Sequence, residues 1–320
     1  MSFLPSMNHL LAADLWSENL QPLIKACAHS HDLQQWECFP TSLTHMVKWA
    51  SVTCHPTCSD RRRSHLMVYK TLPIPGPSGV LYPVSVHLYG FLERFSVGDF
   101  GNWDGDCTKA ACAIQSLSIS GVDNAGAWRN QLERLNLAAT FASRILKIPL
   151  PAIQFRRHIH MQRKVFTKAH HTTAAHTNPP VNNSPQNTHL PKLPDYPWQW
   201  NGPLEILECN ENGTISPIHE VLLSRGDFVE IDAEFDLVIV CTHAMRTHLC
   251  VFLTCKQILR LQMAQAVQHS GGRLPSPPTE VRHMRANAST QDHDVLPLSE
   301  PNLSSATPPL SSQLASTSTM

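Results

Sequence analysis

The segment 226–240 constrains the fold more than any other part of the chain, because apolar and acidic residues alternate along it. The apolar positions are Val229, Ile231, Ala233, Phe235, Leu237 and Ile239, and the acidic positions are Glu230, Asp232, Glu234 and Asp236. Successive side chains of a strand point to opposite faces of the sheet. The pattern therefore predicts an antiparallel strand with its apolar face on the core and its acidic face in water.

The residues after this strand complete a small unit. Leu249, Val251 and Leu253 alternate again after a loop at 241–246, which predicts a hairpin. The following residues, 256–268, are expected to form a helix that ends before two consecutive glycines. Together these elements predict an acidic β-hairpin-plus-helix unit at 198–268.

The first half of the chain mixes helical and strand patterns. Apolar residues recur at a helical period over 125–148, where Pro149 ends the helix, and a weaker pattern predicts a helix over 6–28. Two β-rich runs on either side of a Pro/Gly turn predict a hairpin over 65–89. The sequence therefore predicts a mixed domain at 1–168 and the α+β fold class.

Two segments have the composition of a linker and a tail. Residues 169–197 are rich in Pro, Asn and His, and they are expected to link the two units. From residue 269 to residue 320 there is no Phe, Tyr, Trp, Ile or Cys, while Ser, Thr and Pro are abundant. Such a segment buries too little apolar surface to offset the entropy of ordering, so a disordered tail is expected at 269–320.

The composition favours a soluble intracellular protein. The formal net charge is zero, and no apolar run is long enough for a transmembrane helix. The N-terminus lacks the basic and apolar regions of a secretory signal. The ten cysteines are therefore expected to be thiols in a reducing compartment, the cytoplasm or the nucleus.

One stretch resembles known sequences. Gly226-Asp-Phe-Val-Glu, followed by the paired strand and Gln257-Ile-Leu-Arg-Leu261, is similar to a segment of uncharacterised proteins from mushroom-forming (basidiomycete) fungi. The resemblance covers residues 226–261. It implies an intracellular fungal origin and no activity.

A cluster of cysteine and histidine residues predicts a metal site. Cys54 and Cys58 have a spacing that zinc can use, and His45 and His65 are the candidate third and fourth ligands. A second knuckle, which would strengthen the pattern, is missing from the sequence. Partly buried structural thiols are the alternative interpretation.

Known catalytic motifs do not occur in the sequence. It contains no Gly-x-Ser-x-Gly, no phosphate-binding Walker loop and no His-Glu-x-x-His. No catalytic residue is therefore predicted. The leading interpretation is a non-enzymatic interaction protein, and the alternative is an enzyme or a domain that uses zinc at the 45–65 cluster.

The charges are separated along the chain. Residues 134–194 contain nine Lys and Arg residues and no acidic residue, whereas residues 205–236 contain nine acidic residues. The basic block predicts contacts with a nucleic-acid backbone, through Arg156, Arg157, Arg163 and Lys164. Phe155 and Phe166 are candidates for stacking on unpaired bases. A protein partner, an intramolecular pairing of the two charged segments and a solvated basic face are the alternatives.

Overall fold

The computed structural model describes residues 3–4, 12–27, 35–56, 63–70, 80–168, 198–210, 212–241 and 247–264. The predicted linker at 169–197 and the predicted tail at 269–320 lie outside the described residues. The structure has helices and one large mixed sheet, which agrees with the α+β fold class.

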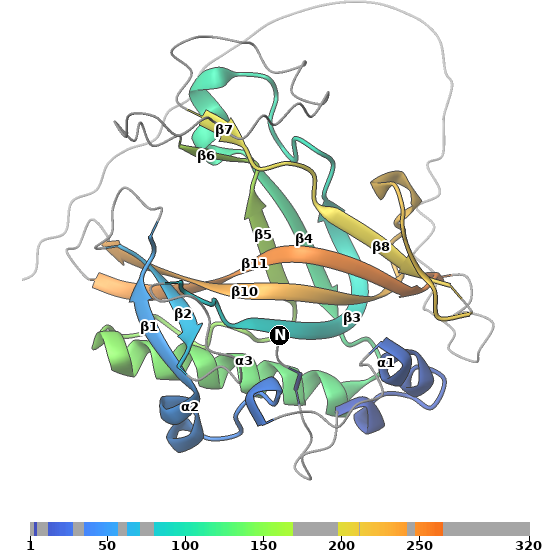
Figure 1. Ribbon diagram of the computed structural model, residues 1–320, viewed down its shortest axis with the longest axis horizontal. Helices are drawn as coiled ribbons and strands as arrows, with labels where there is room; N and C mark the ends of the chain where they lie inside the picture. The colour runs from blue at the N-terminus through green and yellow to red at the C-terminus, as the bar shows by residue number, and fades with distance from the viewer. Residues whose placement is uncertain are drawn as a thin grey trace, which may run out of the picture. The chain divides into compact units, whose positions relative to one another are not determined.

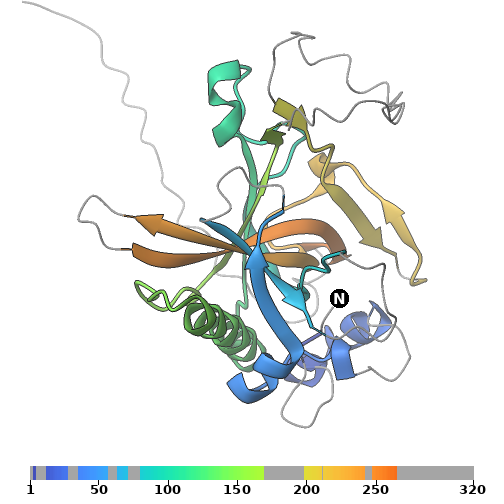
Figure 2. The same cartoon turned by 60° about the vertical axis from the view of Figure 1, so that its left-hand side comes forward.

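A long hairpin forms the middle of the sheet. Its strands are β10 (Phe228–Cys241) and β11 (Thr247–Gln262), which pair antiparallel along their whole length. The alternation at 226–240 thus forms the predicted strand, and the return strand begins where it was expected. The free end of the hairpin projects beyond the neighbouring strands (Figure 2).

Five strands, including both strands of this hairpin, close into a ring. β3 (Ser85–Ser96), β4 (Ile114–Ser120) and β5 (Ile159–Lys164) follow one another between β10 and β11, and β10 pairs with β11 to complete the circle. β4 and β5 rise steeply across the hairpin, whereas β3 first runs along β10 and then bends upward (Figure 1). The junction between β5 and β11 is short, because a single parallel residue pair, Gln162 with Thr254, joins them.

The inner face of the ring is apolar and tightly buried. The strand register places Val86 opposite Ala233, Leu88 opposite Ile231, and Ile119 opposite Ile159. All of these side chains have an exposed fraction of 0% and belong to one core cluster. Burial of such side chains contributes about 1.5–3 kcal/mol each, so this cluster holds the strands in register.

Further strands extend the sheet on both sides of the ring. β1 (Ala50–Cys54) and β2 (Ser64–Tyr69) lie beyond β10, and β8 (Glu205–Cys209) and β9 (Ile215–Pro217) lie beyond β11. A separate two-stranded sheet is formed by β6 (Phe166–Lys168) and β7 (Trp198–Trp200). It lies with η3 (Cys107–Cys112) at the end of β4 and β5 that is far from the helices (Figure 1).

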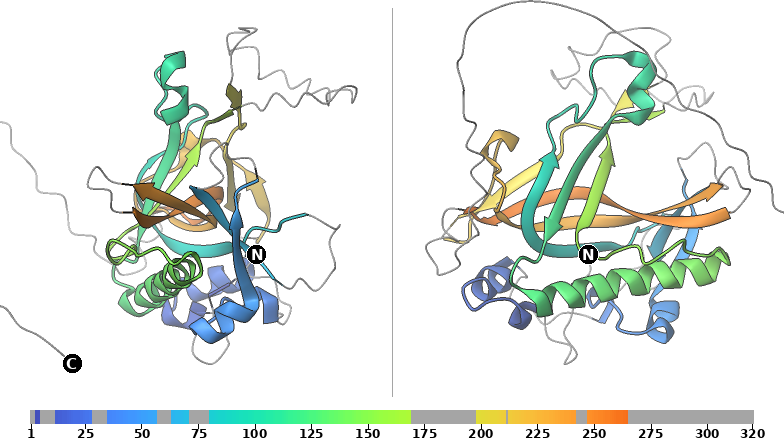
Figure 3. Two further views of the ribbon diagram at one scale, coloured as in Figure 1. Left: turned by 90° about the vertical axis from the view of Figure 1, so that its left-hand side faces the viewer. Right: turned by 180° about the vertical axis from the view of Figure 1, so that it is seen from behind.

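The helices cover the opposite end of the ring. α3 (Ala125–Leu146) runs beneath the strands, on the same side as α1 (Gln21–Cys27) and α2 (Leu43–Trp49) (Figure 3). The shorter helical turns are η1 (Ala12–Leu15), η2 (Gln35–Glu37) and η5 (Glu220–Leu222). α3 confirms the helix predicted over 125–148, whereas only 12–15 and 21–27 are helical in the described part of 6–28.

The helix α3 is anchored to the ring by a polar side chain as well as by its apolar stripe. Gln131 is 2% exposed, and its amide accepts from the Tyr89 backbone N–H at 2.8 Å and donates to the Tyr89 carbonyl at 2.7 Å. Because both partners are backbone groups of β3, the amide satisfies donors and acceptors that would otherwise be costly to bury.

The predicted hairpin over 65–89 is wrong for most of its length. β2 and β3 lie end to end along the same edge of β10, where Leu66 pairs with Asp236 and Ser85 pairs with Glu234. Only the bridge between Val68 and Pro83 joins the two runs directly. Both β-rich runs pair with the long strand β10 instead of with each other.

The small hairpin-plus-helix unit predicted at 198–268 is also wrong. Its two hairpin strands belong to the large sheet, and β11 continues to Gln262, although a helix was expected to begin at residue 256. Ile258, Leu259 and Leu261 are at most 6% exposed although they lie on both faces of β11. A run of apolar residues that is buried on both faces has no strand alternation, which makes it resemble a helix.

Candidate functional site

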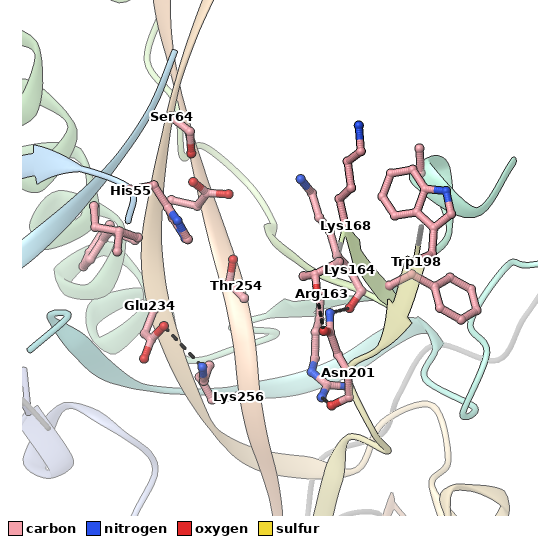
Figure 4. A pocket seen from close by; sticks show the side chains of 16 residues that line it. His55, Ser64, Arg163, Lys164, Lys168, Trp198, Asn201, Glu234, Thr254 and Lys256 are labelled. Atoms are coloured by element: carbon pink, nitrogen blue, oxygen red, sulfur yellow. Dashed lines mark hydrogen bonds and ion pairs between the residues drawn. The ribbon is translucent and has the colours of Figure 1, made fainter. Parts of the chain in front are cut away.

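A cleft opens on the outer side of the β10–β11 hairpin, beside the small β6–β7 sheet. Its volume is about 590 Å³, within the range of about 300–1,000 Å³ that is typical of small-molecule sites. Residues that are far apart in the sequence line it together (Figure 4). The polar and aromatic members are His55, Ser64, Arg163, Lys164, Phe166, Thr167, Lys168, Trp198, Asn201, Glu234, Phe235, Asp236, Thr254 and Lys256.

One wall of the cleft is basic. Lys164 ends β5, Lys168 ends β6, and both side chains stand next to each other beside Trp198 (Figure 4). Both lysines are exposed. Within the described ranges neither ammonium group forms an ion pair, so each is available for an anion.

Arg163 lies at the base of this wall and is held by neutral groups. Its guanidinium donates to Gln115 Oε1 at 2.8 Å, to the Gly202 carbonyl at 2.9 Å and to the Asn201 carbonyl at 2.8 Å. Burial lowers the pKa of Arg163, but an arginine remains charged at neutral pH. No carboxylate of the described segments forms an ion pair with it, so its charge adds to the positive potential of the basic wall.

The opposite wall is acidic. Glu234 and Asp236 come from the same face of β10, with His55 and Ser64 beside them. Glu234 Oε2 lies 3.4 Å from Lys256 Nζ. Burial raises the pKa of Asp236, while the charges of His55 and Lys164 and a hydrogen bond from Ser64 act against that rise. Asp236 Oδ1 is buried without a hydrogen-bond partner among the described residues.

The acidic face of β10 is therefore not the solvated face that the alternation predicted. Glu230 is 7% exposed, and its carboxylate contacts His87 Nδ1 at 2.5 Å. Asp232 accepts a hydrogen bond from the Ser85 hydroxyl, and burial raises the pKa of this carboxyl too. The N-terminal segment covers part of this face, since Phe3 stacks on His87 with ring centroids 4.3 Å apart.

We expect Asp236→Asn to flatten the dependence of stability on pH. A raised pKa means that the folded state holds the proton more tightly than the unfolded state. This carboxyl therefore stabilises the fold below its unfolded pKa of about 3.9, and that contribution is lost as pH rises through the folded pKa. Urea denaturation across a pH series should show Asp236→Asn at least as stable as the parent chain at neutral pH. Asp123→Asn, at an exposed position, is the control, and equal pH slopes in all three proteins would contradict the expectation.

The structure brings only part of the predicted zinc cluster together. Cys54 and His65 are paired residues of β1 and β2, and therefore lie on the same face of the sheet. His45 is in the first turn of α2, which precedes β1, whereas Cys54 is the last residue of β1. The full length of β1 therefore separates the two residues along the chain. Cys58 lies outside the described residues, and within the described part no three His, Cys, Asp or Glu side chains form a group that could hold a metal ion. The zinc site stays a prediction.

The four residues predicted to contact nucleic acid do not form one surface. Arg156 and Arg157 precede β5, whereas Arg163 and Lys164 end it, and a six-residue strand separates the pairs by about 20 Å. The guanidinium of Arg163 also donates its hydrogen bonds to Gln115, Asn201 and Gly202 inside the fold. Arg156, Arg157 and Lys164 are exposed, so a contact with nucleic acid stays a prediction for them.

The stacking role predicted for Phe155 and Phe166 is wrong. Their exposed fractions are 5% and 1%, and each belongs to a hydrophobic cluster. The acidic segment 205–236 forms no ion pair with the basic block among the described residues, although the charge of Lys164 acts on Asp236. In the part of the chain that the structure describes, its ion pairs are made with His87, Arg260 and Lys256, or within the segment.

The sequence interpretation missed Trp198, Glu234, Asp236 and Lys256 as members of a site. The alternation of Trp198 and Trp200 was a usable signal, because two large aromatic residues at strand spacing share a face. Their position next to Lys168 depends on the pairing of β6 with β7 across 29 intervening residues that the structure does not describe. No local pattern indicates such a pairing.

No family model matches the chain, and no curated protein or solved structure is significantly similar to it. Among the described helices, none has both the length and the apolar character needed to cross a membrane. The resemblance of residues 226–261 to basidiomycete proteins stays a prediction. The candidate site therefore rests on its own geometry.

Proposed function

We propose that this chain is a non-enzymatic binding protein that holds a small phosphate-bearing molecule in the cleft. The observation that carries the proposal is the basic wall, where Arg163, Lys164 and Lys168 lie together and no carboxylate of the described residues pairs with them. Three cations at one wall favour a doubly charged ligand such as a phosphate group over a ligand with a single carboxylate. Lysine is a common phosphate ligand because its compact charge accepts many geometries.

The rest of the cleft supports an anionic ligand. Four basic side chains and two carboxylates line it, and one of these carboxylates is already paired with Lys256. The net positive charge raises the local concentration of anions, and the low-dielectric walls strengthen this effect. The proposal keeps the anion-binding part of the sequence prediction, but it replaces a long basic surface with a compact cleft.

The test is pyrophosphate binding by the full chain, measured by isothermal titration calorimetry at about 50 mM salt, where charge interactions are weakly screened. We expect saturable binding that weakens as salt is added. The double variant Lys164→Ala/Lys168→Ala should lose at least about 10-fold in affinity, since each charge-assisted hydrogen bond contributes about 1.5–3 kcal/mol.

A matched variant separates the cleft from general charge. Lys48→Ala/Arg129→Ala removes the same charge from exposed positions of α2 and α3. Its affinity for pyrophosphate should equal that of the parent chain. Equal weakening by both double variants, or no binding by the parent chain, would refute the proposal.

A further inference from the structure

We propose that the phosphate-bearing ligand of the cleft is a nucleotide, with its base on Trp198, its phosphate at Lys164 and Lys168, and its sugar hydroxyls at the acidic wall. This inference rests on the proposed function. It adds two features of the cleft that phosphate alone does not use, which are an aromatic ring beside the lysines and a row of hydrogen-bonding groups opposite them.

The aromatic ring is placed by strand pairing. Trp198 of β7 is the direct partner of Lys168 of β6, so the indole and the ammonium stem stand side by side on the same face (Figure 4). Opposite residues of an antiparallel pair have Cβ atoms about 4.5–5.5 Å apart. A ring that is covalently joined to a phosphate can therefore contact Trp198 while the phosphate contacts Lys168.

Trp198 is supported by packed hydrophobic side chains. The indole packs against a small core made of Ala110, Ala113, Val165 and Phe166. Trp103 contacts Phe166 edge to face, with ring centroids 4.9 Å apart, which fixes this core further. Within the described segments no aromatic ring stacks on Trp198, although it lines the cleft and is only half-buried. A base can therefore stack there without displacing another ring.

The opposite wall is suited to hydroxyl groups. Glu234 and Asp236 present carboxylate oxygens to the cleft, and Ser64, Thr254 and His55 add groups that both donate and accept. Asp236 lines the cleft next to Glu234, and its Oδ1 has no hydrogen-bond partner among the described residues. Carboxylates bind ribose hydroxyls in dinucleotide-binding proteins.

The carboxylates do not prevent phosphate binding, because they lie on the other wall. Lys256 compensates Glu234 at 3.4 Å, and the free lysines stand on the far side of Thr254 (Figure 4). A dipolar arrangement of this kind also orients the ligand. The anionic end meets the lysines, and the neutral, hydroxyl-rich part meets the acids.

The experiment compares pyrophosphate, ribose 5-phosphate, adenosine 5′-monophosphate and uridine 5′-monophosphate on the unmodified full chain by calorimetry. We expect both nucleotides to bind at least about 5-fold more tightly than ribose 5-phosphate, as stacking of one base on one aromatic side chain implies. In Trp198→Leu this preference should disappear, so that both nucleotides bind no more tightly than ribose 5-phosphate. Trp200→Phe, whose ring lies outside the cleft lining, should keep the preference.

The outcomes separate this inference from the proposed function. Pyrophosphate binding with nucleotides no tighter than ribose 5-phosphate would overturn the nucleotide assignment and leave phosphate binding intact. Absence of binding for every phosphate compound would overturn both. Because the comparison of ligands uses the unmodified chain, it decides the question even if Trp198→Leu does not fold.

Discussion

Arg260→Ala is expected to lower the free energy of unfolding by about 3–5 kcal/mol, the usual effect of removing one partner from a buried ion pair. The Arg260 side chain is 6% exposed, and its Nη2 lies 2.7 Å from Glu208 Oε1. Its Nη1 lies 3.6 Å from Asp227 Oδ2 and also donates to the Leu222 carbonyl. One side chain thus joins β11 to β8, to the turn before β10 and to η5.

The large effect comes from the group that the substitution leaves behind. Asp227 is 1% exposed, and without Arg260 its negative charge would keep, among the described residues, only the backbone N–H groups of Ser224 and Ala264, at 2.8 and 2.9 Å. An uncompensated buried charge is more costly than the loss of the pair itself. Urea denaturation, followed by circular dichroism, measures the change.

Two further variants test this explanation. Adding Asp227→Asn to Arg260→Ala removes the stranded charge, so the double variant should be more stable than Arg260→Ala alone. Lys109→Ala removes a pair that is equally short, 2.7 Å to Asp104, but exposed to water. Its denaturation midpoint should stay close to that of the parent chain. A midpoint for Arg260→Ala that matches that of Lys109→Ala would refute the role assigned to Arg260.

Arg260 also shows why part of the fold could be predicted and part could not. Period-two alternation is local, so residues 226–240 were sufficient to predict β10, and the 3.6-residue period was sufficient for α3. Around Arg260 both faces of β11 are buried, and the local pattern is lost. A buried arginine in such a run is recognised only when Glu208 and Asp227 are known to lie beside it.

The strand partners of β10 depend on contacts between distant residues. The Ser85–Asp232 hydrogen bond joins residues 147 positions apart, and no local signal specifies that β3 rather than β2 takes that length of β10. The cleft has the same origin, since His55, Lys164, Trp198 and Glu234 come from four separate segments. The sequence therefore identified the basic block, but it could not show which of its charges are free and which are used inside the fold.

The sequence predicted the buried apolar face of β10 correctly and its solvated acidic face wrongly. Phe235 tests the buried face. Phe235→Ala is expected to cost about 3–5 kcal/mol, because it removes a buried ring and leaves a cavity. Phe235 is 1% exposed, pairs with Leu253 of β11, and lies with its ring centroid 6.2 Å from that of Phe39. The loss should appear as a shift in the urea midpoint with an unchanged slope.

Two controls isolate the contribution of the buried face. Glu234→Gln changes the next residue along β10, on the other face, where the pair with Lys256 is partly exposed, at 46% for the lysine and 23% for the glutamate. Its effect should stay below about 1 kcal/mol. Val221→Ala truncates an apolar side chain that is 76% exposed and should cost less than about 0.5 kcal/mol. If Phe235→Ala cost no more than these two, the apolar face of β10 would not be the core of the ring, and the strand register would have to be reassigned. A loss confined to Phe235→Ala would establish that the alternation along β10 encodes burial of its apolar face.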